Sequence, residues 1–163
     1  MARLLVSACL MGQNVRYDGQ SKTLLNATLS RWDRLGLLVP FCPELAGGLA
    51  VPRLPSEIQP GCNGDDVLAS RARVIDAKGG DVTAAFVAGA QSAVECARAH
   101  GCSHALLTEA SPSCGSSLIY SGDHDGKKRV GMGVTTAALR AAGVTVYGPD
   151  DFDALATSFP PKV

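Results

Sequence analysis

The sequence predicts a three-layer α/β protein, with a mostly parallel, Rossmann-like sheet flanked by helices. Four short apolar runs are typical of buried strands, at residues 3–9, 36–42, 103–110 and 144–149. Segments with helical spacing or high alanine content alternate with these runs, at residues 23–35, 81–101 and 134–143. Because this alternation indicates parallel strand pairing and 163 residues suit one folding unit, we expect a single domain over residues 1–163.

The first two strands both lead to a cysteine. RLLVSAC (3–9) ends at Cys9 and is followed by a polar, glycine-broken loop over 10–22. Residues 23–35 place leucines and one tryptophan near helical spacing, which predicts a helix. GLLVPFC (36–42) is the second strand and ends in another cysteine.

A long segment rich in proline and glycine follows at residues 43–65, and loops of this length in compact domains are typically functional. Residues 67–79 are predicted to be a β segment. The alanine-rich helix over 81–101 has Asp81 or Thr83 as its expected N-cap, with Gly101 beyond its end.

The third strand, 103–110, leads into a second long loop, SPSCGSSLIYSGDHDGKKRVGMG (111–133). We expect a short hairpin within this loop, with His124 at its tip. The predicted helix over 134–143, the strand over 144–149 and a short closing helix complete the chain.

Composition narrows the classes of function. The formal net charge is zero and no basic run is present, which disfavours nucleic acid as a main partner. The N-terminal apolar stretch is too short for a signal peptide, and no apolar run approaches the length of a membrane helix. We therefore expect a cytoplasmic protein with no membrane partner, in which cysteines remain reduced.

Six cysteines are more than core packing needs, which indicates that some of them carry chemistry. Ligands of parallel α/β folds bind beyond the carboxyl ends of the strands. Cys9, Cys42 and Cys114 each follow a predicted strand, so we expect them to converge at one edge of the sheet. The other three are expected elsewhere: Cys102 at the opposite edge, Cys96 in a helix and Cys62 in a loop of undetermined position.

Three converging thiolates suit a soft metal. The chain has no CxxC pair, so a local zinc knuckle is disfavoured and the fold itself must assemble the site. Spacing alone leaves zinc and an iron–sulfur cluster both open.

Five motifs resemble the DUF523 family, whose characterised branch is the thiouracil desulfidases. In chain order they are VSACLMGQNVRYDG, CPELAGGLAVPRLPSEI, DVT, SPSCG and GMGVTTAALRAAGV, and they span nearly the whole chain. One departure is the Thr108-Glu109-Ala110 sequence before SPSCG, where the family often has a lysine.

The resemblance implies a [4Fe–4S] enzyme that removes sulfur from thiouracil, or a related thiolated pyrimidine, without redox turnover. Cys9, Cys42 and Cys114 would be the cluster ligands, and the sulfur of the substrate would bind the open iron. Glu44 would be the acid or base that activates water, with Ser111 or Ser113 relaying a proton. Uracil and hydrosulfide would be the products.

The same loops supply candidate substrate-binding residues, which would bind the pyrimidine or order the loops: Arg16, Tyr17, Asp18, Arg53 and Glu57. Structural alternatives exist for several of these side chains. Glu44 would pair with Arg53 or cap a helix, Arg16 would pair with Asp18, and the serines of SPSCG would act as caps.

Two other functions remain open. A cysteine-persulfide sulfurtransferase would need one thiol of low pKa and no cluster. A non-enzymatic zinc- or cluster-binding protein would have four protein ligands and no pocket. For the enzyme, the expected partner is a thiolated pyrimidine, as free base, nucleoside or tRNA-derived base, and the sequence predicts no oligomeric state.

Overall fold

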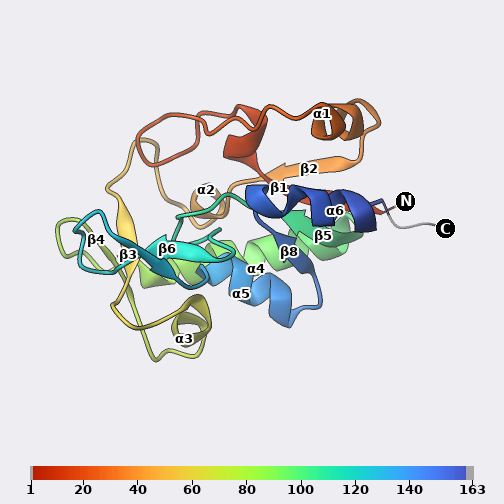
Figure 1. Cartoon of the computed structure of the whole chain (residues 1–163). Helices are drawn as coiled ribbons and strands as arrows, with labels where there is room; N and C mark the ends of the chain where they lie inside the picture. The colour runs from red at the N-terminus through yellow and green to blue at the C-terminus, as the bar shows by residue number, and fades with distance from the viewer. Residues whose placement is uncertain (1, 161–163) are drawn as a thin grey trace.

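In the computed structural model, which describes residues 2–160, four parallel strands form the central sheet (Figure 1). The strand order is β2–β1–β5–β8. Their bounds are β1 (Arg3–Ser7), β2 (Leu38–Phe41), β5 (Cys102–Leu106) and β8 (Thr145–Tyr147). The predicted α/β class and all four predicted strands of the sheet are confirmed.

Helices cover both faces of this sheet, as Figure 1 shows. On one face lie α1 (Ala27–Arg34) and α6 (Phe152–Ser158), and on the other lie α4 (Thr83–Ala99) and α5 (Val134–Ala141). Successive residues of a strand point to opposite faces. Leu4 and Val6 of β1 accordingly pack with Trp32 of α1, whereas Leu5 packs with Ala93 of α4.

The central position of β1 explains its uninterrupted apolar sequence. It pairs in parallel with β2 on one side and with β5 on the other, so both of its faces and both of its edges are covered. Ser7 lies opposite Phe41, and Val6 lies opposite Leu106. The carboxyl ends of three adjacent strands therefore meet at one edge of the sheet.

Shorter elements extend beyond that edge of the sheet. They are α2 (Pro43–Ala46), β3 (Ser56–Ile58), α3 (Gly64–Leu68), β4 (Val74–Asp76), β6 (Leu118–Tyr120) and β7 (Lys128–Val130). Four of them (β3, α3, β4 and β6) contribute to a third apolar cluster. β3 pairs with β4, and β6 with β7, both antiparallel. Ile58, Val74 and Ile119 pack together with Phe86 of α4 in this cluster, which joins the two ribbons to the three-layer body.

The predicted β segment over 67–79 is wrong in its first half: residues 67–68 are the last two of α3, and turns and irregular backbone follow over residues 69–73. The Asp66 carboxylate accepts a hydrogen bond from the backbone N–H of Asn63 at 2.8 Å and stabilises the start of this short helix. Only residues 74–76 form a strand. The predicted hairpin within 111–133 is confirmed as β6 and β7.

Three element ends differ from the prediction. The first strand stops at Ser7, and Cys9 lies in a 3-10 turn, η1 (Ala8–Met11). Helix α1 begins at Ala27 because Asn26 Oδ1 accepts the backbone N–H of Leu29 at 3.0 Å. In α4 the N-cap position is Val82, although Asp81 Oδ1 accepts the backbone N–H of Thr83 at 3.0 Å. Within residues 2–160, no helix combines the length and apolarity that crossing a membrane would require.

Candidate active site

A cavity of about 380 Å³ opens where the three adjacent strands end. Cys9, Cys42 and Cys114 all line it, so the predicted convergence of these three cysteines is confirmed. Cys9 follows β1 in η1, and Cys42 stands between β2 and α2. Cys114 lies in the turn that follows β5 by several residues.

All three thiols are free and shielded from solvent. Cys9 and Cys114 are buried and Cys42 is half-buried. Burial raises the pKa of each thiol, most strongly for Cys114, where the neighbouring Cys9 adds to the rise. Thiolates in this position therefore need a cationic partner, and a soft metal centre supplies one.

A cluster and a single metal ion place different demands on the spacing of their ligands. Across residues 2–160, no three His, Cys, Asp or Glu side chains lie close enough together to hold one metal ion. The three cysteines of a cluster each bind a different iron, so they stand farther apart than the ligands of one zinc ion. Three thiols that line one cavity without being gathered around a single point are compatible with this wider arrangement.

A buried hydroxyl at the cavity also fits a bound group. Thr108 lines the cavity and is only 7% exposed. Its Oγ1 is buried without a hydrogen-bond partner among the described residues. Buried polar atoms are nearly always paired in folded proteins, so this hydroxyl is suited to a ligand in the cavity.

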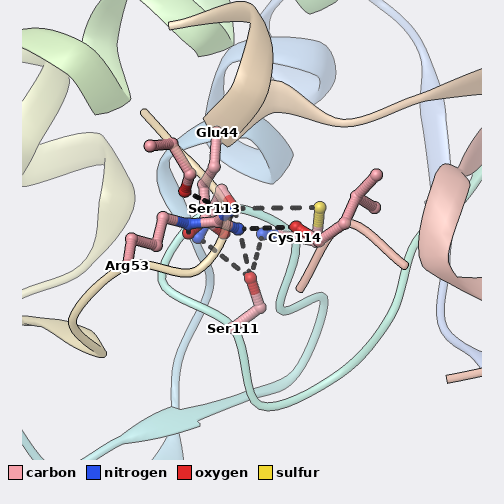
Figure 2. Close-up of polar contacts among 7 residues, drawn as sticks. Glu44, Arg53, Ser111, Ser113 and Cys114 are labelled. Atoms are coloured by element: carbon pink, nitrogen blue, oxygen red, sulfur yellow. Dashed lines mark hydrogen bonds and ion pairs between the residues drawn. The ribbon is translucent and has the colours of Figure 1, made fainter. Parts of the chain in front are cut away.

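Glu44, the predicted acid or base, lines the cavity and uses both carboxylate oxygens (Figure 2). Oε1 accepts a hydrogen bond from Arg53 Nε at 3.1 Å, and Oε2 accepts one from Ser113 Oγ at 2.8 Å. The pairing with Arg53 that the sequence left open is therefore present. The carboxylate is fixed on one side by a cation and on the other by a hydroxyl.

Arg53 is held as firmly as the carboxylate that it pairs with. Its side chain is 8% exposed. Besides Nε, its Nη1 donates to the carbonyl of Ala50 at 3.1 Å and its Nη2 donates to the carbonyl of Val15 at 3.0 Å. Arg53 thus ties the loop after β1 to the loop after α2, with Glu44 between them.

The two serines of SPSCG play different parts. Ser111 lines the cavity, and its Oγ accepts the backbone N–H groups of Ser113 at 3.2 Å and Cys114 at 3.0 Å, which shapes the turn. Ser113 is 1% exposed and its Oγ lies 3.1 Å from Ser111 Oγ and 3.9 Å from Cys114 Sγ. The hydroxyl of Ser113 donates its one hydrogen to Glu44, so its oxygen remains available to accept from the Ser111 hydroxyl. Ser113 thus links Ser111 to the Glu44 carboxylate (Figure 2).

Four of the five candidate substrate-binding residues line the cavity, and the exception is Asp18. Its Oδ1 accepts the backbone N–H of Gln20 at 3.0 Å, and within the described chain it makes no ion pair with Arg16. The Arg16 guanidinium instead lies 5.8 Å from the ring centroid of Tyr17. Asp18 orders its own loop, the structural role that the sequence left open.

Sequence reasoning missed several lining residues, among them Lys22 and Glu109. Lys22 Nζ donates to the carbonyl of Glu109 at 3.3 Å, so the first loop brings a lysine beside the Thr108-Glu109-Ala110 segment. Glu109 binds the backbone and side chains of two residues that follow Cys114. Its carboxylate accepts the backbone N–H groups of Ser116 and Ser117 and both of their hydroxyls.

His124 was predicted to lie at a hairpin tip, and it does lie between β6 and β7. It also lines the cavity, and its Nδ1 lies 3.4 Å from Glu57 Oε2. No short sequence pattern connects these two residues, which belong to separate ribbons, so their proximity could not be predicted.

Three comparisons with known proteins agree with one another. The sequence model of the 2-thiouracil desulfurase family matches residues 4–151. YbbK, an uncharacterized protein of Bacillus subtilis (strain 168), is 39% identical over 150 residues, which make up 92% of this chain and 97% of YbbK. The solved structure of the [4Fe-4S]-dependent thiouracil desulfidase TudS is similar with a TM-score of 0.87 and 43% identity, over 97% of each chain.

Proposed function

This chain belongs to the 2-thiouracil desulfurase family, and from that premise we propose that it is a [4Fe–4S]-dependent, non-redox thiouracil desulfidase. It converts a thiolated pyrimidine and water into the corresponding uracil and hydrosulfide. The observation that carries this proposal is the cavity where three adjacent strands end, which holds three free thiols and one fixed carboxylate. We further propose that residues 1–163 act as one cytoplasmic domain, where the six free cysteines stay reduced.

Cys9, Cys42 and Cys114 are the proposed ligands of the cluster. When bound, it supplies an iron without a protein ligand, a Lewis acid that polarises the C–S bond of a thiocarbonyl. The protein supplies a shielded site and the groups that move protons.

Glu44 is the proposed general base. It accepts one proton of a water molecule, whose oxygen forms a bond to the thiocarbonyl carbon. As that bond forms, the C=S double bond opens onto sulfur. The electron pair of the remaining O–H bond then completes the carbonyl, the C–S single bond breaks with its electron pair on sulfur, and the second water proton passes to sulfur, which leaves as hydrosulfide. The cycle closes when Glu44 returns its proton to solvent.

The serines and Arg53 support this carboxylate. Ser113 donates to Glu44 Oε2, and Ser111 lies within hydrogen-bond distance of Ser113 at the cavity wall. Two hydroxyls thus connect the cavity to the base and relay its proton. Arg53 holds Oε1 from the other side and keeps the carboxylate oriented.

The size and lining of the cavity favour a base-sized substrate. A volume of about 380 Å³ lies at the lower end of the range for small-molecule sites. Arg16 and Tyr17 line it from the first loop, and we propose that they contact the pyrimidine ring and its carbonyl group. A thiolated base or nucleoside suits such a cavity better than a folded tRNA.

Two observations disfavour the alternatives. A persulfide carrier needs a thiol of lowered pKa, whereas burial raises the pKa of Cys9, Cys42 and Cys114. A scaffold protein has no need of a cavity with an oriented acid–base group. The arrangement of thiols and carboxylate therefore favours the desulfidase.

The test is an anaerobic assay of protein reconstituted with iron and sulfide. Visible and EPR spectra report the cluster, and loss of 4-thiouracil absorbance with release of uracil and sulfide reports turnover. The variant Cys114→Ala should lose both the cluster and the activity. A cluster without turnover would contradict the proposed substrate, and failure to bind iron would contradict the proposed cofactor.

A further inference from the structure

His124 is joined to a buried carboxylate on a separate ribbon of the protein. Glu57 of β3 is 8% exposed, and its Oε1 accepts the backbone N–H groups of Gly122 at 2.8 Å and His124 at 3.3 Å. Its Oε2 lies 3.4 Å from His124 Nδ1. One carboxylate thus binds the backbone of this hairpin loop and lies beside Nδ1 of the imidazole ring.

The backbone at His124 is in a conformation that the ring does not favour. Its φ is 54°, in the left-handed region, where this chain otherwise uses glycine at most positions. Among residues 2–160, the other non-glycine residues with positive φ are Ser70 and Ala110. Ala110 and His124 line the cavity, which places two of these three costly conformations at the proposed site.

The pairing also determines what the ring offers to a ligand. A carboxylate only accepts hydrogen bonds, so its position beside Nδ1 favours the neutral tautomer that carries the hydrogen on Nδ1. Nε2 then has a free lone pair and accepts a hydrogen bond. The proposed mechanism assigns no role to the imidazole ring of His124, although His124 lines the same cavity as the thiols and Glu44.

We propose that His124 is a specificity-determining residue that accepts a hydrogen bond from a ring N–H of the pyrimidine, and that Glu57 is its positioning residue. This inference rests on the proposed function. It predicts that the protein distinguishes a pyrimidine with a free N–H from the same pyrimidine methylated at that nitrogen, because methylation removes the donor.

The experiment compares ring N–H recognition in the wild type and three variants. His124→Gly removes the ring at a position where glycine relieves the left-handed backbone. Glu57→Gln keeps the shape, but its amide N–H₂ directed at Nδ1 favours the tautomer in which Nε2 is a donor. Lys127→Ala changes an exposed residue of the same hairpin loop that does not line the cavity, and is the control.

Two measurements are made on the reconstituted holoenzyme. Steady-state KM is determined for 4-thiouracil and its N1-methyl and N3-methyl derivatives, and calorimetry gives the Kd of uracil and its two methyl derivatives without turnover. In the wild type and Lys127→Ala, one of the two methylations should weaken binding about tenfold, the value of one hydrogen bond. In His124→Gly and Glu57→Gln that discrimination should disappear, with kcat less affected than KM.

Equal discrimination in His124→Gly and the wild type would overturn the assignment of His124. If His124→Gly no longer discriminates against the methylated pyrimidine but Glu57→Gln still does, the positioning role of Glu57 is overturned. If the wild type turns over 4-thiouracil and neither methylation changes KM or Kd, the inference fails while the proposed function stands. If the wild type neither turns over thiouracil nor binds uracil, the proposed function fails and the inference fails with it.

Discussion

Ser113 and Glu44 are 69 residues apart in the sequence, and Ser113 Oγ lies 2.8 Å from Glu44 Oε2. Ser113 directly precedes Cys114, and Glu44 follows Cys42 by two residues, so this contact joins the segments that carry two proposed cluster ligands. The carboxylate is thereby held beside the thiols.

We predict that Glu44→Gln lowers kcat/KM for thiouracil by about 10² to 10⁴, the usual contribution of a general base. The amide cannot accept a proton from water, while its oxygen can still accept from Arg53 Nε and its N–H₂ can donate to Ser113 Oγ once that hydroxyl turns. Iron content and the visible spectrum should match the wild type. An unchanged kcat/KM in a variant with a full cluster would show that another group activates water.

The two serine substitutions should have separable effects. Ser113→Ala removes the donor to Glu44 and should reduce kcat with little effect on the turn. Ser111→Ala exposes the N–H groups of Ser113 and Cys114 and should lower the free energy of unfolding by about 1–3 kcal/mol. Steady-state kinetics and urea unfolding of both variants measure this difference. Equal changes in kcat and in the free energy of unfolding for the two variants would contradict separate roles for Ser111 and Ser113.

The three proposed ligands should be individually necessary for the cluster. Cys9→Ala, Cys42→Ala and Cys114→Ala should each lose most of the bound iron after anaerobic reconstitution. Cys96→Ala is the matched control, because Cys96 lies on α4 and does not line the cavity. Iron and sulfide analysis with EPR provides the measurement, and a full cluster in Cys42→Ala would remove that residue from the ligand set.

Arg53→Lys should be a severe substitution despite its conserved charge. Lysine has one donor group at its end and cannot bind Glu44 and the carbonyls of Ala50 and Val15 with the geometry of the guanidinium. We expect a loss of about 1–3 kcal/mol in the free energy of unfolding and a lower kcat. Arg71→Lys, at an exposed ion pair, is the control and should change little.

Glu109 should make stability depend on pH in a defined direction. Burial raises the pKa of its carboxyl, but hydrogen bonds from Ser116 and Ser117 outweigh this and hold the pKa below its usual value. A lowered native pKa contributes stability above the unfolded value of about 4.3, and that contribution is lost as the pH falls through the native pKa.

The corresponding variant is Glu109→Gln, compared with the wild type by urea unfolding from pH 7 to pH 3. The wild type should be more stable at pH 7, and the difference should shrink below about pH 4. Asp33→Asn, which removes an exposed carboxylate of α1, is the matched control. A difference between wild type and Glu109→Gln that grows on acidification would contradict the role of Glu109.

The sheet could be predicted because its strands bury both faces. Leu4, Leu5 and Val6 form an uninterrupted apolar run that only a covered strand requires. The segment 67–79 was misread because only residues 74–76 form a strand, and residues 67–68 belong to the five-residue helix α3, which is too short for helical spacing to be visible. Its start depends on the Asp66–Asn63 hydrogen bond, a local signal that the apolar pattern obscured.

The candidate site could be predicted where it depends on strand order and not where it depends on contacts between ribbons. Cys9, Cys42 and Cys114 each follow a strand, and parallel strands bring their carboxyl ends to one edge. The contact of His124 with Glu57 depends on packing between two ribbons and not on strand order. His124 is 67 residues from Glu57, and the contact exists only because the β6–β7 ribbon packs near β3.

The order of strands β2–β1–β5 also sets the time at which the site can form during synthesis. The ribosome releases Cys9 and Cys42 early, together with β1 and β2, while the other edge of β1 still has no partner. That edge is paired only when β5 emerges, and Cys114 follows it. A nascent chain therefore presents two of the three proposed ligands on an incomplete sheet while the residues between β2 and β5 are added, and cofactor insertion belongs after the release of the second long loop.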